Sequence, residues 1–559
     1  MRSVRDARGW VWWGLIALVL AAAVALRIPS VWAGYPYTAY VDEGHLMQPV
    51  EKLLATGTWS ALENNYPQLP VRAIAGAARL AALPLSGETK VRLGAEVRIV
   101  PTTRTFSVVN PPELLLVARW LSLLVSGGIV LLAAVYARKL AGDAAGVVAG
   151  LAAALLPALV LRGAIVTVDV YATFFVLAAL LLTAGVASPR QWLRLAAAGA
   201  CCGLAAVSKY PAGLVGLAVV LELLLLPWKW SERLRAAAAA GASGVVAALL
   251  AMPALVVEPR EVWARMAYQQ GVYAIQRIGS YWGQAVHYAE WDLPAQSAEL
   301  GWTFLVLALA GLAVGVATRR WQRPAFGWLL FGALLVGLHA SYAFRAFRNL
   351  LPLAALGCVA FALLVAWVGE RLRWPRLVAA VAAALLLALF LRVGLGYARE
   401  RSTIVDSRSE AVDWLARHGA RYAATLVVAE TVLGPRELAR LGKPAEVPWE
   451  AARRHLLHAR PRFVLVPNLG DDNGPLIAAA DDPAVLALYD VKATFGHQDG
   501  ILRSPYRGNR LRLYVLERRP GARRSFKEAT SAETGTNSSS GKFSGLSQNS
   551  PSPPAPHDS

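Results

Sequence analysis

The sequence predicts an α-helical polytopic membrane protein of about eleven transmembrane helices, followed by a small C-terminal α/β domain. Hydrophobic residues make up 56% of the 559 positions, charged residues only 16%, and the mean hydropathy is +0.44. A soluble protein of this size could not bury so much apolar surface, so the solvent for most of the chain must be lipid. Beyond residue 397 the hydropathy falls, and short helix and strand patterns replace the long apolar runs.

The first apolar run, Trp10–Leu26, follows three arginines. It exceeds the ~7–15 residues of a signal-peptide core, which favours a retained first span over a cleaved signal. A long polar stretch then extends to Glu113, and further runs recur at close to the ~20 residues that a bilayer core requires. We place these spans at residues 114–137, 144–161, 168–187, 193–208, 211–227, 236–256, 299–318, 326–343, 350–369 and 377–396.

Basic residues fall at every second connection between the runs, as at Arg138-Lys139 and Arg319-Arg320. This is the pattern of cytoplasmic loops, so the net charge of +20 does not indicate a nucleic-acid partner. With a cytoplasmic N-terminus, the loops 29–113 and 257–298 and everything after Tyr397 lie on the outer side. Heavy use of Ala, Leu, Arg, Gly and Val with little Lys is typical of a GC-rich bacterial genome, and we expect a multi-pass protein of the bacterial inner membrane.

Residues 398–518 show the pattern of an extracytoplasmic α/β domain. Residues 519–559 are rich in Ser, Gly and Pro without apolar periodicity and are predicted to be disordered. The three cysteines lie inside apolar runs and cannot form a disulfide framework. In the α/β domain we expect helices at 409–418 and 449–458 and strands at 425–429, 462–467 and 511–516.

The first outer loop carries two adjacent carboxylates, Asp42 and Glu43, followed by Gly44, His45 and a helical pattern at Leu46–Leu54 that ends in a turn at Thr56-Gly57. One interpretation is a helix N-terminus, where acidic side chains are favourable. The functional interpretation is that one carboxylate removes a proton from an acceptor hydroxyl while its neighbour orients it.

Further motifs lie on the same predicted side of the membrane, and their order resembles that of the GT-C glycosyltransferases. The similarity is greatest to the branch of protein O-mannosyltransferases and aminoarabinose transferases, so the chain resembles glycosyltransferase family 39. Residues 1–397 would then be the transmembrane catalytic domain, with a large first outer loop at 29–113. The motifs are Val41–His45, Tyr66–Pro70 (YPQLP), Thr167–Asp169 (TVD), Ser208–Tyr210 (SKY), Arg345–Pro352 (RAFRNLLP) and Asp406–Trp414 (DSRSEAVDW).

The resemblance implies an inverting transfer of a sugar from a polyprenyl-phosphate carrier to a hydroxyl or phosphate acceptor on the outer face. Asp42 would be the base. Inversion needs one displacement and no enzyme nucleophile, so the protein mainly positions the acceptor and stabilises charge on the leaving phosphate. The implied site residues are Asp42, Glu43 and Asp169 for catalysis, Lys209, Arg345 and Arg348 for the donor phosphate, and His45, Tyr66, Tyr210, His287 and Tyr288 for the substrates.

Each of the implied phosphate and acid residues also has a structural interpretation. Lys209 can snorkel at a helix end, and Arg345 and Arg348 can anchor the membrane interface. Asp169 can cap a helix. The aromatic residues around His287 in the 257–298 loop can form an interfacial belt instead of stacking on a sugar.

The sequence does not predict a metal site. The aminoarabinose branch has an acidic-basic pair before its Pro-Pro-Leu, where this chain has Asn65 and Tyr66. Glu43 and His287 alone are too few ligands for zinc, so no cofactor is assigned, although a divalent metal stays an alternative. Alternating residues in 88–109 predict a hairpin that matches no feature of the family.

Three other classes were weighed against the transferase. A transporter has a similar number of spans, but charged residues are nearly absent from the centres of the runs and no two-half repeat is visible. A lipid-carrier ligase or polymerase of polysaccharide shares the donor type, and a binding-only receptor leaves the first outer loop without a role. The expected partners are a polyprenyl-phosphate sugar, membrane lipids and a lipid, glycan or protein acceptor, whose identities the sequence leaves open.

Overall fold

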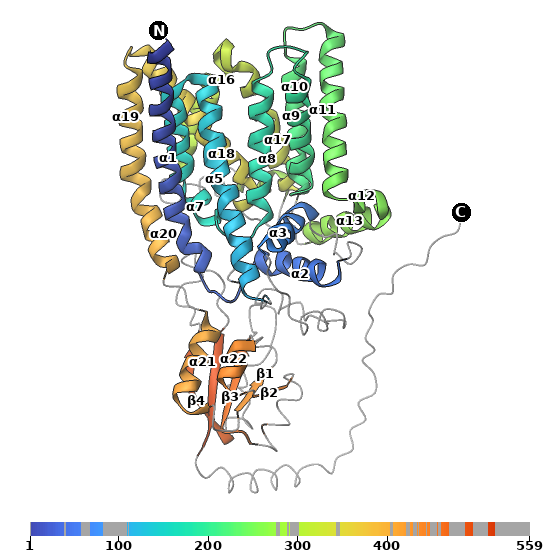
Figure 1. The fold of residues 1–559 in the computed structure, drawn as a ribbon, viewed down its shortest axis with the longest axis vertical. Helices are drawn as coiled ribbons and strands as arrows, with labels where there is room; N and C mark the ends of the chain where they lie inside the picture. Colours follow the sequence, from blue (N-terminus) through green and yellow to red (C-terminus); the bar gives the residue numbers. More distant parts are fainter. Residues whose placement is uncertain are drawn as a thin grey trace, which may run out of the picture. The chain divides into compact units, whose positions relative to one another are not determined.

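The computed structural model divides into a helical unit that runs from the N-terminus to Glu410 and a second unit that begins at Ala411 and contains a β-sheet (Figure 1). The predicted hairpin, the predicted tail beyond residue 519 and most of the helix predicted at 449–458 lie outside the described residues. The structure describes residues 2–38, 41–57, 67–81, 109, 111–275, 280–287, 290, 301–341, 347–402, 406–420, 425–428, 433, 435–442, 444–447, 456, 460–468, 487–495 and 512–519.

The helical unit confirms the predicted class, because an apolar helix lies at each predicted span. Within the described residues, six helices are long and apolar enough to cross a membrane by length and composition, and five shorter apolar helices lie at the other predicted runs. The chain is therefore a multi-pass membrane protein. The long helices are α1 (Arg2–Trp32), α5 (Glu113–Ala141), α11 (Trp230–Ala251), α17 (Arg319–Ala340), α18 (Leu351–Arg371, preceded by η5, Phe347–Leu350) and the continuous α19 (Pro375–Leu386), η6 (Leu387–Leu391) and α20 (Arg392–Ser402).

The predicted third span is interrupted at Pro157. It forms α6 (Asp143–Leu155) and α7 (Pro157–Arg162), because proline has no N–H to donate to the preceding turn. Buried Arg27 of α1 satisfies the freed carbonyls, donating to Ala154 O at 2.9 Å and Ala153 O at 3.1 Å. The other shorter apolar helices are α8 (Val168–Ala184), α9 (Trp192–Ala206), η2 (Tyr210–Leu214) with α10 (Val215–Leu224), and α16 (Gly301–Ala317).

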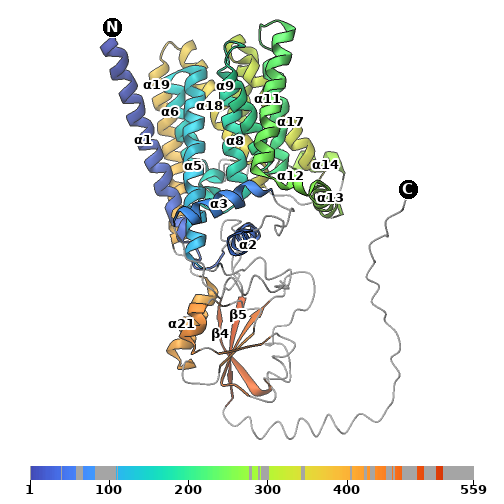
Figure 2. The same cartoon turned by 45° about the vertical axis from the view of Figure 1, so that its right-hand side comes forward.

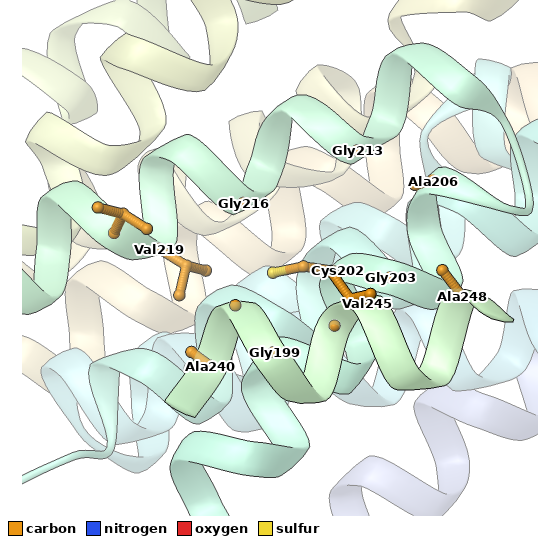
Figure 3. A pocket seen from close by; sticks show the side chains of 13 residues that line it. Gly199, Cys202, Gly203, Ala206, Gly213, Gly216, Val219, Ala240, Val245 and Ala248 are labelled. Atoms are coloured by element: carbon orange, nitrogen blue, oxygen red, sulfur yellow. The ribbon is translucent and has the colours of Figure 1, made fainter. Parts of the chain in front are cut away.

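Small residues let α9 and α11 approach closely. A Cβ atom added at Gly199 would lie 1.9 Å from Ala240 O, and one at Gly203 would lie 2.0 Å from Gly244 O, so larger side chains are excluded. Close backbone approach through small residues is a general way to pack helices in lipid. A cavity of about 290 Å³, lined by small and apolar side chains of α9, α10 and α11, lies beside this contact (Figure 3).

Short helices gather at the end of the bundle opposite the start of α1 (Figure 2). The predicted helix after the paired carboxylates is confirmed as α2 (Val41–Thr56), and Gly57 ends it with φ +68°. Amphipathic α3 (Gln68–Leu80), which the sequence analysis missed, buries Val71 and Ile74 in a core shared with α2 and α5. The remaining short helices here are α12 (Ala254–Val257), α13 (Pro259–Ile275) and α14 (Tyr281–His287).

The second unit contains a mixed five-stranded sheet in the order β2-β1-β3-β5-β4. Strand β1 pairs in parallel with β2 and β3, whereas β5 pairs antiparallel with β3 and β4. The three predicted strands and the predicted first helix are confirmed, and β2, β4 and α22 were missed. The elements are α21 (Ser407–Arg417, whose first turn belongs to the helical unit), β1 (Thr425–Val428), α22 (Pro435–Arg440), β2 (Ala445–Val447), β3 (Phe463–Asn468), β4 (Tyr489–Phe495) and β5 (Arg512–Arg518).

Glu222 of α10 departs from the expectation that span centres lack charge. Its side chain is fully buried, and neither carboxyl oxygen has a hydrogen-bond partner among the described residues. The carboxyl group lies against α17, where a Cβ atom at Gly327 would come within 2.6 Å of Glu222 Oε1. A buried polar group without a partner costs about 1–3 kcal/mol.

We expect Glu222→Met to raise the thermal unfolding midpoint of the purified protein, because it removes the unpartnered carboxyl group and supplies an adaptable apolar chain. Glu261→Met is the matched control, since Glu261 is exposed on α13 and water already solvates its carboxylate. An unchanged or lower midpoint for Glu222→Met would show that the carboxyl group stabilises the fold.

Candidate functional site

Asp42 is the second residue of α2, so its backbone lies in the first helical turn. Its side chain is outside the described part of the structure. The position of this turn is therefore read from the neighbouring Glu43, whose side chain is described and fully buried.

Glu43 forms a buried two-pronged ion pair with Arg119 of α5. Arg119 Nε donates to Glu43 Oε1 at 2.8 Å and Nη2 donates to Oε2 at 2.7 Å, with both side chains at 0% exposure. The same guanidinium donates to the carbonyls of Val31 and Ala33 at 2.9 and 2.8 Å, at the C-terminal end of α1. One arginine thus holds α1, α2 and α5 together at this end of the bundle.

Glu43 also reaches the segment before α8. The Val166 backbone N–H donates to Glu43 Oε1 at 3.3 Å. Thr167 then caps α8, accepting from the Asp169 backbone N–H at 3.3 Å and donating its hydroxyl to Asp169 Oδ2 at 2.8 Å. Since Val166 and Asp169 are three residues apart, their Cα atoms are separated by at most ~10 Å. The first turns of α2 and α8 therefore belong to one site.

Basic side chains from two other segments converge on Asp169. Lys209 lies in the turn between α9 and η2, and its Nζ donates to Asp169 Oδ1 at 2.5 Å and to Asn349 Oδ1 at 2.8 Å. Arg348 of η5 places Nε 4.0 Å from Asp169 Oδ2. Helix α8 begins at Val168, where the predicted fourth span begins, and Lys209 lies in the short gap between the predicted fifth and sixth spans.

The electrostatics of this cluster favour an anion. Asp169 is buried at 2% exposure, whereas the side chains of Lys209 and Arg348 keep 18% and 21% exposure. Among the described side chains of this cluster, two are cations and one is a carboxylate, and the two cations are the groups that solvent can reach. Charged donors of this kind form short, strong hydrogen bonds to phosphate oxygens.

The structure brings Glu43, Asp169, Lys209 and Arg348 together. Tyr210 follows Lys209 and is partly buried, with its hydroxyl 3.9 Å from Met252 Sδ. His45 is partly buried in α2, and His287 is partly buried at the end of α14, which is anchored by the hydrogen bond from Tyr281 Oη to Gly337 O at 3.0 Å. The roles of these three residues stay predictions, and Tyr66, Tyr288 and Arg345 lie outside the described residues.

Two polar residues of the site were missed by the sequence analysis. Arg119 lies inside the predicted second span, and a single charge within an apolar run is itself a signal of a buried functional or structural pair. Asn349 stands next to Arg348 in the RAFRNLLP motif, but nothing local to the sequence shows that its amide meets Lys209. Within the described residues, no group of three or more His, Cys, Asp or Glu side chains is arranged to hold a metal ion.

Comparisons with known proteins match part of the sequence to a family model and most of the chain to solved structures. Residues 113–257 match the family model described as dolichyl-phosphate-mannose-protein mannosyltransferase. No curated protein matches the sequence.

Solved structures of similar fold cover most of the chain. ArnT from Cupriavidus metallidurans, solved bound to undecaprenyl phosphate, is 15% identical, and the match covers 91% of this chain and 98% of that chain with a TM-score of 0.53. Its apo form gives 16% identity, the same coverage and a TM-score of 0.52. The archaeal oligosaccharyltransferase AglB from Archaeoglobus fulgidus, in complex with an inhibitory peptide and a dolichol-phosphate, is 13% identical over 82% of this chain and 69% of that chain, with a TM-score of 0.45.

We expect Arg119→Met to destabilise the helical unit by about 3–5 kcal/mol, because it leaves the Glu43 carboxylate buried without its counter-charge. The double variant Glu43→Gln with Arg119→Met should recover part of this loss, since a neutral amide still accepts from Val166 N–H. The unfolding free energies of the purified variants measure both effects.

Arg320→Met is the control, because it breaks an exposed pair with Glu370 whose contribution should not exceed about 1 kcal/mol. If Arg119→Met costs no more than this control, the buried pair does not hold the site together.

Proposed function

We propose that this chain, a member of the GT-C superfamily by its fold, is an inverting glycosyltransferase that moves a sugar from a polyprenyl-phosphate carrier to a hydroxyl or phosphate acceptor. The observation that carries the proposal is the pair of partly exposed cations, Lys209 and Arg348, beside the buried Asp169 carboxylate, which is joined through Val166 and Glu43 to the helix turn that bears Asp42.

The donor phosphate binds at Lys209 and Arg348. A polyprenyl-phosphate sugar carries its negative charge on the phosphodiester, and the lysine ammonium and the arginine fork are suited to its oxygens. Asp169 accepts a hydrogen bond from the Lys209 ammonium and keeps it in place before the donor arrives, which is the arrangement expected of preorganised charge stabilisation. ArnT, which shares the fold, was solved with undecaprenyl phosphate, and this supports a lipid-phosphate ligand here.

Transfer then proceeds in one displacement. The acceptor oxygen forms a bond to the anomeric carbon while the bond from that carbon to the phosphate oxygen breaks, and its electron pair leaves with the phosphate. Asp42 takes the acceptor proton as general base. Lys209 and Arg348 stabilise the charge that grows on the leaving phosphate. Glu43 is a positioning residue, because both its oxygens already accept from Arg119 and one also accepts from Val166.

The reaction takes place on the outer face of a bacterial inner membrane. The support for this orientation is the distribution of basic clusters, which puts the N-terminus in the cytoplasm and the turns bearing Asp42 and Lys209 outside. The acceptor is a lipid, a glycan or a protein, and the first outer loop selects it.

We expect Asp42→Asn to lower sugar transfer by about 10²–10⁴-fold with little change in the donor KM, because the amide keeps the shape of the side chain but cannot take a proton. The assay incubates purified protein with a panel of radiolabelled polyprenyl-phosphate sugars, with and without candidate acceptors. Asp143→Asn is the control, since Asp143 pairs with Arg138 and is 54% exposed. Transfer at the wild-type rate by Asp42→Asn contradicts the base assignment.

We expect Lys209→Met and Arg348→Lys to raise the donor KM by about tenfold or more, because the first removes a charge and the second replaces a planar fork by a point charge. Initial rates at varied donor concentration separate this effect from kcat. Arg190→Lys is the control, since Arg190 is exposed in the turn before α9. If the donor KM is unchanged in both variants, Lys209 and Arg348 have only a structural role.

A further inference from the structure

The segment that leads into α2 contacts a second buried arginine, Arg408, which lies near the C-terminal end of the helical unit. Arg408 stands in the first turn of α21, in the DSRSEAVDW motif, and is fully buried. Its guanidinium carbon lies 3.6 Å above the centre of the Tyr37 ring. Tyr37 is also fully buried and precedes Asp42 by five positions.

Asp406 fixes the orientation of this guanidinium. Arg408 Nε donates to Asp406 Oδ1 at 2.8 Å and Nη2 donates to Oδ2 at 3.0 Å, while the Arg408 backbone N–H donates to Oδ1 at 2.9 Å. The Nε–Nη2 edge of the guanidinium is thus bound to one carboxylate, and its flat face lies over the tyrosine ring. A cation held over an aromatic face in a desolvated site is a strong contact.

The hydrogen bonds from Arg119 to this segment differ in length. Its bonds to the carbonyls of Val31 and Ala33 are 2.9 and 2.8 Å long, but its Nη2 reaches Tyr37 O only at 3.4 Å. The Tyr37 ring itself packs against the guanidinium of Arg408. The segment before α2 therefore lies between two buried arginines, one on its backbone and one on its ring.

We propose that Arg408 is a positioning residue for sugar transfer, which sets the Tyr37 segment and through it the approach of Asp42 to the acceptor. The inference rests on the proposed function. Small displacements of a reacting group lower the rate steeply without weakening the binding of a substrate at another point. Since the donor phosphate binds at Lys209 and Arg348, loss of the Arg408 contact should lower kcat and leave the donor KM nearly unchanged.

The test measures kcat and donor KM for Arg408→Met and Tyr37→Leu, each of which removes one side of the contact. We expect kcat to fall roughly 10- to 100-fold in both, with donor KM within about twofold of the wild type. Tyr37→Phe keeps the aromatic face and should recover most of the rate, which a general loss of packing would not predict. The double variant should be no slower than the slower single variant, because the two residues act through one contact.

Arg417→Met, an exposed change on the same helix, is the control. If Arg408→Met does not fold, Tyr37→Leu and Tyr37→Phe still decide the matter by their rate difference. Equal rates for these two variants, or a rise in donor KM that accounts for the whole loss, overturn the inference. The failure of the proposed function looks different, since the wild-type protein would then consume no donor in the panel.

Discussion

The candidate site depends on the buried pair between Arg119 and Glu43. Moving two charges out of water is expensive, and their attraction repays the cost only when the geometry is good and the remaining donors and acceptors are satisfied. Both conditions hold here, because the fork meets both carboxylate oxygens and another of its nitrogens donates to the carbonyls of Val31 and Ala33 at the end of α1. The main gain is positional, since α2, α5 and the C-terminal end of α1 meet at one guanidinium.

Asp169 compensates the charge of Lys209 and Arg348 and restrains them, as Arg119 does for Glu43. A buried carboxylate next to Lys209 and Arg348 neutralises part of their charge and restrains their side chains before any ligand is present. The restraint is what makes the remaining charge useful, because donors that are already aimed need no reorganisation when negative charge develops. Asn349 adds a neutral acceptor for the Lys209 ammonium, so the lysine keeps two fixed partners and one donor directed elsewhere.

The sequence predicted the parts of the fold that have local causes. Apolar runs predicted the membrane helices, and the span predicted from residue 168 does begin at Val168, because period and length act within a few residues. The meeting of Arg119 with Glu43 lies beyond such reasoning, since 76 positions separate them. The missed strand β4 is an edge strand with Asp490 and Lys492 among its residues, and charged edge strands lack the apolar alternation by which strands are recognised. The break at Pro157 was visible in the sequence, but the Arg27 side chain that makes it tolerable in lipid was not.

The two adjacent carboxylates of the first outer loop can now be assigned different tasks. Glu43 points into the protein, where Arg119 compensates its charge and Val166 occupies one oxygen, so a proton taken by it would break the contact that holds the site together. In the proposed reaction the proton must therefore go to Asp42. In the proposed reaction Glu43 anchors the helix turn and Asp42 takes the proton. This division of tasks explains why two carboxylates are adjacent, which helix capping alone does not.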